Sequence, residues 1–157
     1  VGKRKDQSGI GPLLDLLASN DNKDRAIRNA VVYALTLIGK PDDVITAAAG
    51  LPAAVRLGVV LTLRRAVSVG VAGYLADEDP VVAIEAARAV YDMNIAAGLP
   101  ALARMLDQPI AKDRAIEPLM RRVIEANAIV GDDAAVERLA RFATDSNVEP
   151  AWRLLAA

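Results

Sequence analysis

The 157-residue sequence predicts an all-α fold, a right-handed α-solenoid built from paired helices. Two observations indicate it. In four long segments the apolar residues recur every three or four positions, which is the spacing of an amphipathic helix. These segments also resemble one another and return at a nearly fixed interval, and paired helices that repeat in this way bury their apolar faces by stacking. An ordinary helical bundle is the alternative.

Four long helices are expected, and each begins with Asp, Glu or Pro, residue types that suit a helix N-terminus. Their ranges are 24–39, 52–67, 79–94 and 117–131. In each helix a charged residue stands at the same place of the repeat; these residues are Arg28, Arg56, Glu85 and Arg121, at intervals of 28, 29 and 36 residues. The longer last interval contains an insertion at 107–114, so we expect at least four helix pairs.

Shorter helices are expected to complete the pairs at 41–49, 69–76, 99–106 and 132–143. A helix at 12–18 reads as the second member of an earlier pair, and 150–157 reads as the start of a fifth copy. Gly39 and Gly131 stand where a helix commonly ends in the left-handed conformation, so we expect both to adopt it.

The ends of the chain predict a linker or tail at 1–9, followed by a repeat domain at 10–157. The basic run Lys3-Arg4-Lys5 is expected to be solvated, with polyanion binding as the alternative. The chain starts without Met and stops within a helix, so we expect an internal segment of a longer protein. The longest apolar stretch, 58–63, is far shorter than the roughly 20 residues that cross a bilayer, so no membrane span is expected here.

The composition argues against most catalytic chemistry. The chain has no Cys and no His, which removes thiolate nucleophiles, the usual general base near neutral pH and the commonest metal ligands. We therefore predict no catalytic residue, no metal and no cofactor. The three Met residues stand at apolar helical positions and are expected in the core. Nineteen Lys and Arg against twenty Asp and Glu give a net charge of −1, which does not favour nucleic acid.

Clustered carboxylates stand at expected helix starts, at Asp42-Asp43, Asp77-Glu78-Asp79 and Asp132-Asp133. We expect them to cap helices, with acid/base pairs or Ca²⁺ ligands as the alternatives. The oxygen-rich segment 20–24 lacks the glycine and the distal glutamate of an EF-hand loop, so it predicts a polar turn.

Arginines at one repeat position, Arg28, Arg56 and Arg121, predict a structural ladder that bonds to acidic turns of neighbouring repeats. The adjacent pairs Arg64-Arg65 and Arg121-Arg122 could instead clamp phosphate or carboxylate groups. Neighbouring helical residues point about 100° apart, so only one member of each pair can face a given site.

Two asparagines, Asn29 and Asn127, fall inside long helices, where Asn has poor propensity. They are expected to bond a neighbouring backbone, with ligand binding as the alternative. Near the end of the chain, Trp152, Leu154 and Leu155 form an apolar helix face without a following partner. We expect this face to be a docking interface and to cause weak self-association of the isolated chain. Trp152 itself is expected to pack on the preceding helix, with an exposed interface anchor as the alternative.

The phrase at 79–90, Asp-Pro-Val-Val followed by alanines at helical spacing, resembles the HEAT repeat family in its short, alanine-rich bacterial form. Five longer phrases, taken in order, are similar to the helical segment of bacterial membrane-bound dehydrogenases of the PVC-type haem-binding-domain family; they span 55–65, 75–82, 85–92, 99–103 and 121–127. The resemblance implies a preceding β-propeller, a following cytochrome c-like domain and an exported or periplasmic location. No redox residue of that family can be assigned here, because the chain has no Cys-x-x-Cys-His motif.

The sequence therefore predicts a non-catalytic scaffold or interaction module whose partner is protein, namely the neighbouring domains of a larger dehydrogenase. Two alternatives are a nucleic-acid-binding HEAT-like domain and a HEAT-like lyase-type enzyme. The balanced charge disfavours the first, and the missing His and Cys disfavour the second.

Overall fold

A computed structural model describes residues 7–107 and 117–157, and within these ranges all regular structure is helical. The all-α prediction is confirmed. The α-helices are α1 (Ile10–Asn20), α2 (Arg25–Ile38), α3 (Pro41–Ala47), α4 (Ala53–Arg65), α5 (Pro80–Asp92), α6 (Leu99–Arg104), α8 (Glu117–Val130), α9 (Asp133–Thr144) and α10 (Pro150–Ala156). The 3₁₀-helices are η1 (Gln7–Gly9), η2 (Val69–Tyr74), η3 (Ala96–Gly98) and η4 (Met105–Asp107).

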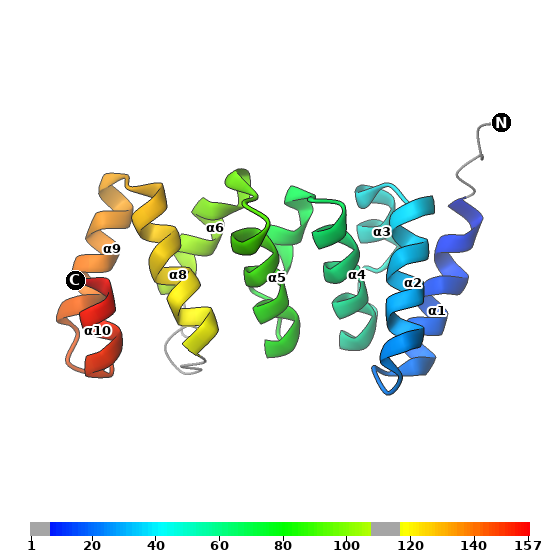
Figure 1. Ribbon diagram of the computed structural model, residues 1–157, viewed down its shortest axis with the longest axis horizontal. Helices are drawn as coiled ribbons and strands as arrows, with labels where there is room; N and C mark the ends of the chain where they lie inside the picture. Colours follow the sequence, from blue (N-terminus) through cyan, green and yellow to red (C-terminus); the bar gives the residue numbers. More distant parts are fainter. Residues whose placement is uncertain (1–6, 108–116) are drawn as a thin grey trace.

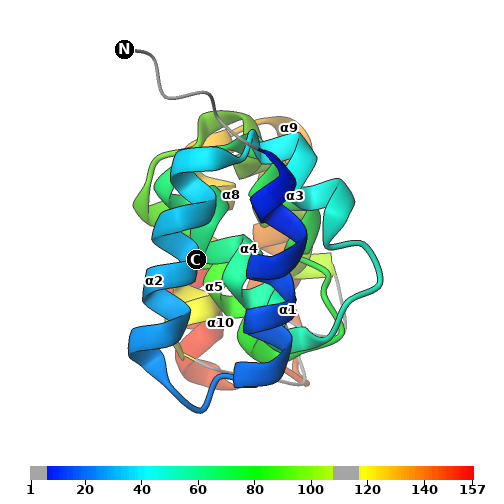
Figure 2. The ribbon, with the colours of Figure 1, turned by 90° about the vertical axis from the view of Figure 1, so that its right-hand side faces the viewer.

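The long helices α2, α4, α5 and α8 stand side by side in chain order along the longest axis of the molecule (Figure 1). The shorter elements that precede them, α1, α3, η2 and α6, form a second layer behind them, and the view along that axis shows α1 and α3 on one side and α2 on the other (Figure 2). Each short element also contacts the long helix that follows it: α1 packs on α2, α3 on α4, η2 on α5 and α6 on α8.

The helix ends follow the local chemistry of their sequences. The side chain of Asp24 accepts hydrogen bonds from the backbone N–H groups of Ala26 (2.7 Å) and Ile27 (3.3 Å), which fixes the start of α2. Asp79 and Asp132 cap α5 and α9 in the same way. The periodic segments therefore begin at these capping residues, and the predicted boundaries lie within a few residues of the observed ones.

One glycine does not behave as expected. Gly131 is left-handed, with φ = 61°, but Gly39 is extended, with φ = −91° and ψ = 144°. Pro41 keeps the preceding Lys40 extended, and with Gly39 also extended the chain enters α3 without a left-handed cap. The position still requires glycine, because a Cβ at Gly39 would lie 2.5 Å from Cγ2 of Val44.

Two of the short helices differ from the predicted form. The segment 69–76 was expected to be an α-helix but forms the 3₁₀-helix η2 over Val69–Tyr74. Two glycines within six residues weaken an α-helix, and 3₁₀ geometry suits so short a segment. The helix expected at 99–106 ends as α6 at Arg104 and tightens into η4.

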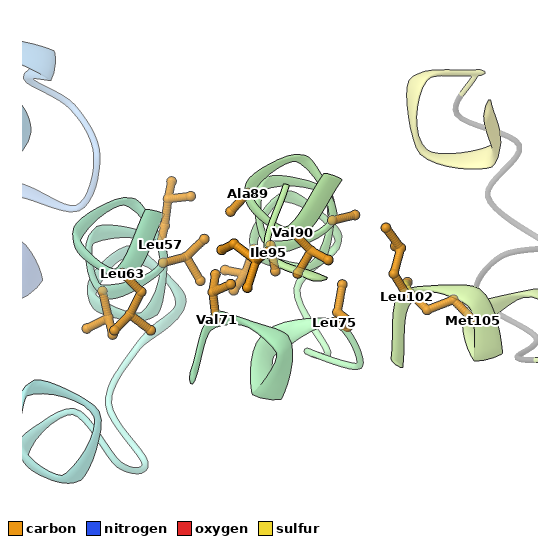
Figure 3. Packing of buried hydrophobic residues seen from close by; sticks show 14 of the residues in the cluster. Leu57, Leu63, Val71, Leu75, Ala89, Val90, Ile95, Leu102 and Met105 are labelled. Carbon is orange, nitrogen blue, oxygen red and sulfur yellow. The ribbon is translucent and has the colours of Figure 1, made fainter. Parts of the chain in front are cut away.

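Helix α4 is the centre of the core. Eight of its thirteen residues are buried, and Val55, Val59, Val60 and Leu63 are completely shielded. A helix that is apolar on most sides is expected in an interior position. Leu57 and Leu63 of α4, Val71 of η2 and Val90 of α5 belong to one buried cluster (Figure 3). Each such side chain contributes about 1.5–3 kcal/mol when fully buried.

We expect Gly58→Ala to lower the free energy of unfolding by about 1–2 kcal/mol, because overpacking outweighs the gain in helix propensity. A Cβ at Gly58 would lie 2.5 Å from Cδ1 of Leu17, a side chain of α1 that is itself fully buried. The matched control is Gly73→Ala, where nothing lies within 4 Å of the new Cβ. Urea unfolding of both variants measures the difference, and equal midpoints would contradict the close contact of α1 with α4.

The predicted tail at 1–9 is described only from residue 7. Gln7 begins η1, and its Nε2 donates a hydrogen bond of 2.6 Å to Oδ2 of Asp43. The basic run Lys3-Arg4-Lys5 and most of the predicted 107–114 insertion lie outside the described residues.

Candidate protein-binding groove

Arg56 makes the contact with an acidic turn that was expected of each arginine in the predicted ladder. Its Nε and Nη2 donate to the two carboxylate oxygens of Asp77 at 2.8 and 2.9 Å. Nη2 also donates to Oε1 of Glu78 (3.1 Å), and Nη1 donates to the backbone oxygen of Leu51 (2.9 Å). The hydrogen bonds that Arg56 donates to Asp77 raise the pKa of Arg56 above its ordinary value, although burial acts in the opposite direction. Arg56 thus ties α4 to the acidic turn before α5.

Arg121 does not form a rung of such a ladder. Its Nη2 donates to Oε1 of Glu117 at 2.9 Å, within α8 itself. The next residue, Arg122, makes the connection between helices, because its Nε and Nη2 reach the carboxylate of Asp92 at the end of α5 (2.9 and 3.1 Å). The predicted ladder is therefore wrong at Arg121. Only one of two adjacent arginines can face the neighbouring helix, and here it is the second.

Arg28 stands 28 residues before Arg56 and, among the described residues, has no carboxylate partner. Its buried Nε finds no hydrogen-bond partner among the described residues, and its guanidinium forms no ion pair there. The register explains the difference. Residues 77 and 78 are Asp and Glu, whereas the residues 28 positions earlier are Ala49 and Gly50. The turn before α4 therefore supplies no carboxylate for Arg28.

Arg28 lines a cavity of about 270 Å³ where the N-terminal ends of α2, α4 and α5 meet. Its apolar lining includes Ala53 and Leu57 of α4. Asn22 also lines this cavity, and its buried Oδ1 has no hydrogen-bond partner in the part of the chain that the structure describes. The remaining charged group is Asp79, whose Oδ1 already accepts the N–H of Val81 at 2.8 Å.

A second cavity, of about 390 Å³, lies at the C-terminal end of α4. Its lining consists of Asn29, Val32, Leu61, Arg64, Arg65 and Met93. The guanidinium carbon of Arg65 lies 5.5 Å from the ring centroid of Tyr33, within the range of a cation–π contact. Arg64 is engaged by Glu85 of α5 at 3.6 Å. Met93 was expected in the core but is 37% exposed here.

The two cavities lie along one face of α4. Ala53, Leu57, Leu61 and Arg65 are spaced by four residues, and residues with this spacing stack on one side of a helix. Helix α2 contributes to one wall of both cavities, and the start and end of α5 contribute to the other. We call this surface the α4 groove, defined by the residues that line the two cavities.

The sequence predicted parts of this surface but not its arrangement. Arg28, Asn29 and the Arg64-Arg65 pair were noticed separately, and the structure places them on the α4 groove. The two cavities themselves were not predicted, because they depend on how α2, α4 and α5 pack against one another. Asn29 lines the groove, whereas Asn127 is completely buried elsewhere.

A third cavity of about 670 Å³ lies between η4 and α9. Its charged lining is already paired: Arg141 lies 3.2 Å from Asp107, and Nε of Arg138 donates to Oδ1 of Asn127 at 2.8 Å. It adjoins Asp107, the last residue described before position 117. This cavity therefore presents less unpaired charge than the α4 groove.

The residues predicted as an end interface fall into two kinds. Trp152 is partly buried and packs against the core, while Leu154 is 80% and Leu155 39% exposed on α10. The apolar surface presented by α10 is therefore that of the two leucines.

We expect the 157-residue chain to self-associate weakly through α10, because contact between copies removes apolar surface from water. Light scattering at increasing concentration measures this, and Leu154→Glu should abolish it. The matched control is Val136→Glu on α9, where the replaced side chain is also exposed. A strict monomer at high concentration would contradict the prediction.

Only some of the clustered carboxylates cap a helix with their side chains: Asp79 and Asp132 do, whereas Asp77 and Glu78 bind Arg56 and no described side chain caps α3. Asp42 and Asp43 lie in the first turn of α3, and Asp132 accepts the N–H of Ala135 at 2.7 Å. Within the described ranges no three carboxylates gather as metal ligands. None of the helices described is both long and apolar enough to traverse a bilayer.

Comparison with known proteins gives no relative. No protein family matches the chain, and neither a curated protein nor a solved structure matches it. The α4 groove must therefore be interpreted from its own chemistry.

Proposed function

We propose that the chain is a HEAT-like, right-handed α-solenoid that serves as a non-catalytic scaffold and docks a protein partner in the α4 groove. Support for the solenoid comes from the succession of long helices in chain order and from the short element that packs on each of them (Figure 1). Neighbouring repeats are joined by side-chain bridges, such as Arg56 with Asp77 and Arg122 with Asp92. Neighbour-to-neighbour contacts of this kind are typical of repeat arrays.

The α4 groove is the observation that carries the docking role. It consists of two cavities that follow one helix, and together they combine an apolar floor with arginine and asparagine side chains. A peptide needs such a surface, because its side chains require apolar contacts while its backbone requires polar partners. The neighbouring domains of a larger dehydrogenase remain the partner that the sequence resemblance suggests.

Peptide selection tests this function. A library of random 12-residue peptides is displayed on phage and selected on the full chain, and the dissociation constants of recovered peptides are measured by fluorescence polarisation. Leu61→Gln, in the groove floor, should weaken binding at least about tenfold, since it replaces apolar contact by an amide. The control is Leu16→Gln on α1, an exposed leucine outside the groove.

Two results would overturn the docking role. One is that no recovered peptide distinguishes Leu61→Gln from Leu16→Gln. The other is that the chain instead binds mixed-sequence duplex DNA with a steep salt dependence, which is the mark of phosphate neutralisation.

A further inference from the structure

We propose that the partner segment is acidic and extended, and that one of its carboxylates binds Arg28 at the N-terminal end of the α4 groove. The inference rests on the proposed docking function and specifies its ligand. The segment carries Asp or Glu at two positions four residues apart, with an apolar side chain midway between them.

The protein contains its own template for the Arg28 contact. One repeat later, Arg56 holds Asp77 through two nearly parallel hydrogen bonds of 2.8 and 2.9 Å. This bidentate geometry is the strong form of an arginine–carboxylate contact. Arg28 stands at the equivalent place, with a buried and unpartnered Nε. A carboxylate of the partner segment accepts hydrogen bonds from Arg28 as the carboxylate of Asp77 does from Arg56.

The second unsatisfied group favours a peptide over a simple anion. Asn22 Oδ1 lines the same cavity, is buried and accepts no hydrogen bond. Phosphate and sulfate in their common ionised forms mainly offer acceptors. They suit the Arg28 guanidinium but leave Asn22 Oδ1 without a donor. A peptide offers both kinds of group, because its carboxylate can accept from Arg28 while its backbone N–H donates to Asn22. Leaving either group unsatisfied is unfavourable when it is buried.

The far end of the groove supplies a second cation. Arg65 is exposed, lies against the ring of Tyr33 and has no carboxylate partner among the described residues, whereas Arg64 is engaged by Glu85. Arg65 is eight residues from Leu57, which corresponds to about 12 Å along a helix axis. An extended peptide covers about 13 Å in four residues, and its alternate side chains point the same way. The first and fifth side chains then reach the two arginines, and the third lies over Leu57 and Leu61.

The other charged groups facing the groove do not cancel this preference. Asp79 is held by the N-terminal amides of α5. Glu85 is shared by Arg64 and by Arg88, whose Nη1 lies 2.6 Å from its Oε1. Arg28 and Arg65 are therefore the cations left to attract an acidic segment.

The probe is a blocked peptide containing Glu-Thr-Leu-Thr-Glu, titrated into the full chain and followed by NMR chemical shifts. We expect saturable shifts in the groove, and Arg28→Gln should weaken binding by about tenfold or more, as for a charged hydrogen-bonded contact. Arg25→Gln removes the same charge from an exposed position of α2 and should change affinity less than twofold. The peptide with Lys in place of its first Glu should bind Arg28→Glu better than it binds the wild-type chain.

The outcomes distinguish the acidic-segment inference from the docking function on which it rests. If selected peptides bind the groove but show no excess of Asp and Glu, or if Arg28→Gln and Arg25→Gln behave alike, the acidic-segment inference is overturned and the docking function stands. If no peptide binds the groove at all, both are overturned. Circular dichroism of each variant shows that the fold is retained.

Discussion

Replacing Asn127 with alanine is expected to lower the free energy of unfolding by about 3 kcal/mol. The Asn127 side chain is completely buried and joins three helices. Its Nδ2 donates to the backbone oxygen of Ala103 in α6 at 2.9 Å and to that of Val123 at 2.8 Å, and its Oδ1 accepts from Nε of Arg138 in α9. Alanine would leave buried polar groups without partners, which costs more than the loss of an exposed hydrogen bond.

Urea unfolding followed by circular dichroism measures this effect. The matched control is Asn29→Ala, at an exposed position of α2, which should stay within about 0.5 kcal/mol of the wild-type chain. A similar small change for Asn127→Ala would show that the buried amide does not hold α6, α8 and α9 together.

The second large effect is expected for Arg56→Gln, which should lower the free energy of unfolding by about 3 kcal/mol. The side chain of Asp77 is only 7% exposed and that of Arg56 17%, so removing the arginine leaves a nearly buried carboxylate without its cation. The turn before α5 would lose its connection to α4 at the same time.

Arg121→Gln is the matched control, because it removes an exposed pair within one helix that is worth only about 0.3–0.5 kcal/mol. Adding Asp77→Asn to Arg56→Gln should recover part of the loss, since the uncompensated charge is then gone. If Arg56→Gln costs no more than Arg121→Gln, the bridge between Arg56 and Asp77 does not stabilise the fold.

The helices could be predicted from the sequence because their signals are local. Asp24, Asp79 and Asp132 cap their helices through their own backbone neighbours, and the apolar period identifies the face that each helix buries. By contrast, the 3₁₀ form of η2 depends on the balance between its two glycines and tertiary packing. The extended conformation of Gly39 depends on the direction in which the chain leaves α2 toward α3. Neither balance can be judged from residue spacing alone.

The site was harder to predict, because it depends on contacts between helices that are far apart in the sequence. The choice of Arg122 over Arg121 requires the position of Asp92, 30 residues earlier in the chain. The unpaired state of Arg28, however, has a signal in the sequence. Comparing Asp77-Glu78 with Ala49-Gly50, 28 positions earlier, shows that the turn before α4 has no carboxylates at the matching positions.

The central claim is that a protein segment docks in the α4 groove, and mapping a bound peptide tests it most directly. The strongest peptide from the selection is added to isotopically labelled chain, and methyl and amide shifts are recorded at saturation. We predict that the largest changes cluster at Leu57, Leu61 and Met93 and at the amides of Arg28 and Asn29. Changes that cluster on the opposite layer, at α1 and α3, with the α4 groove unaffected, would contradict the claim.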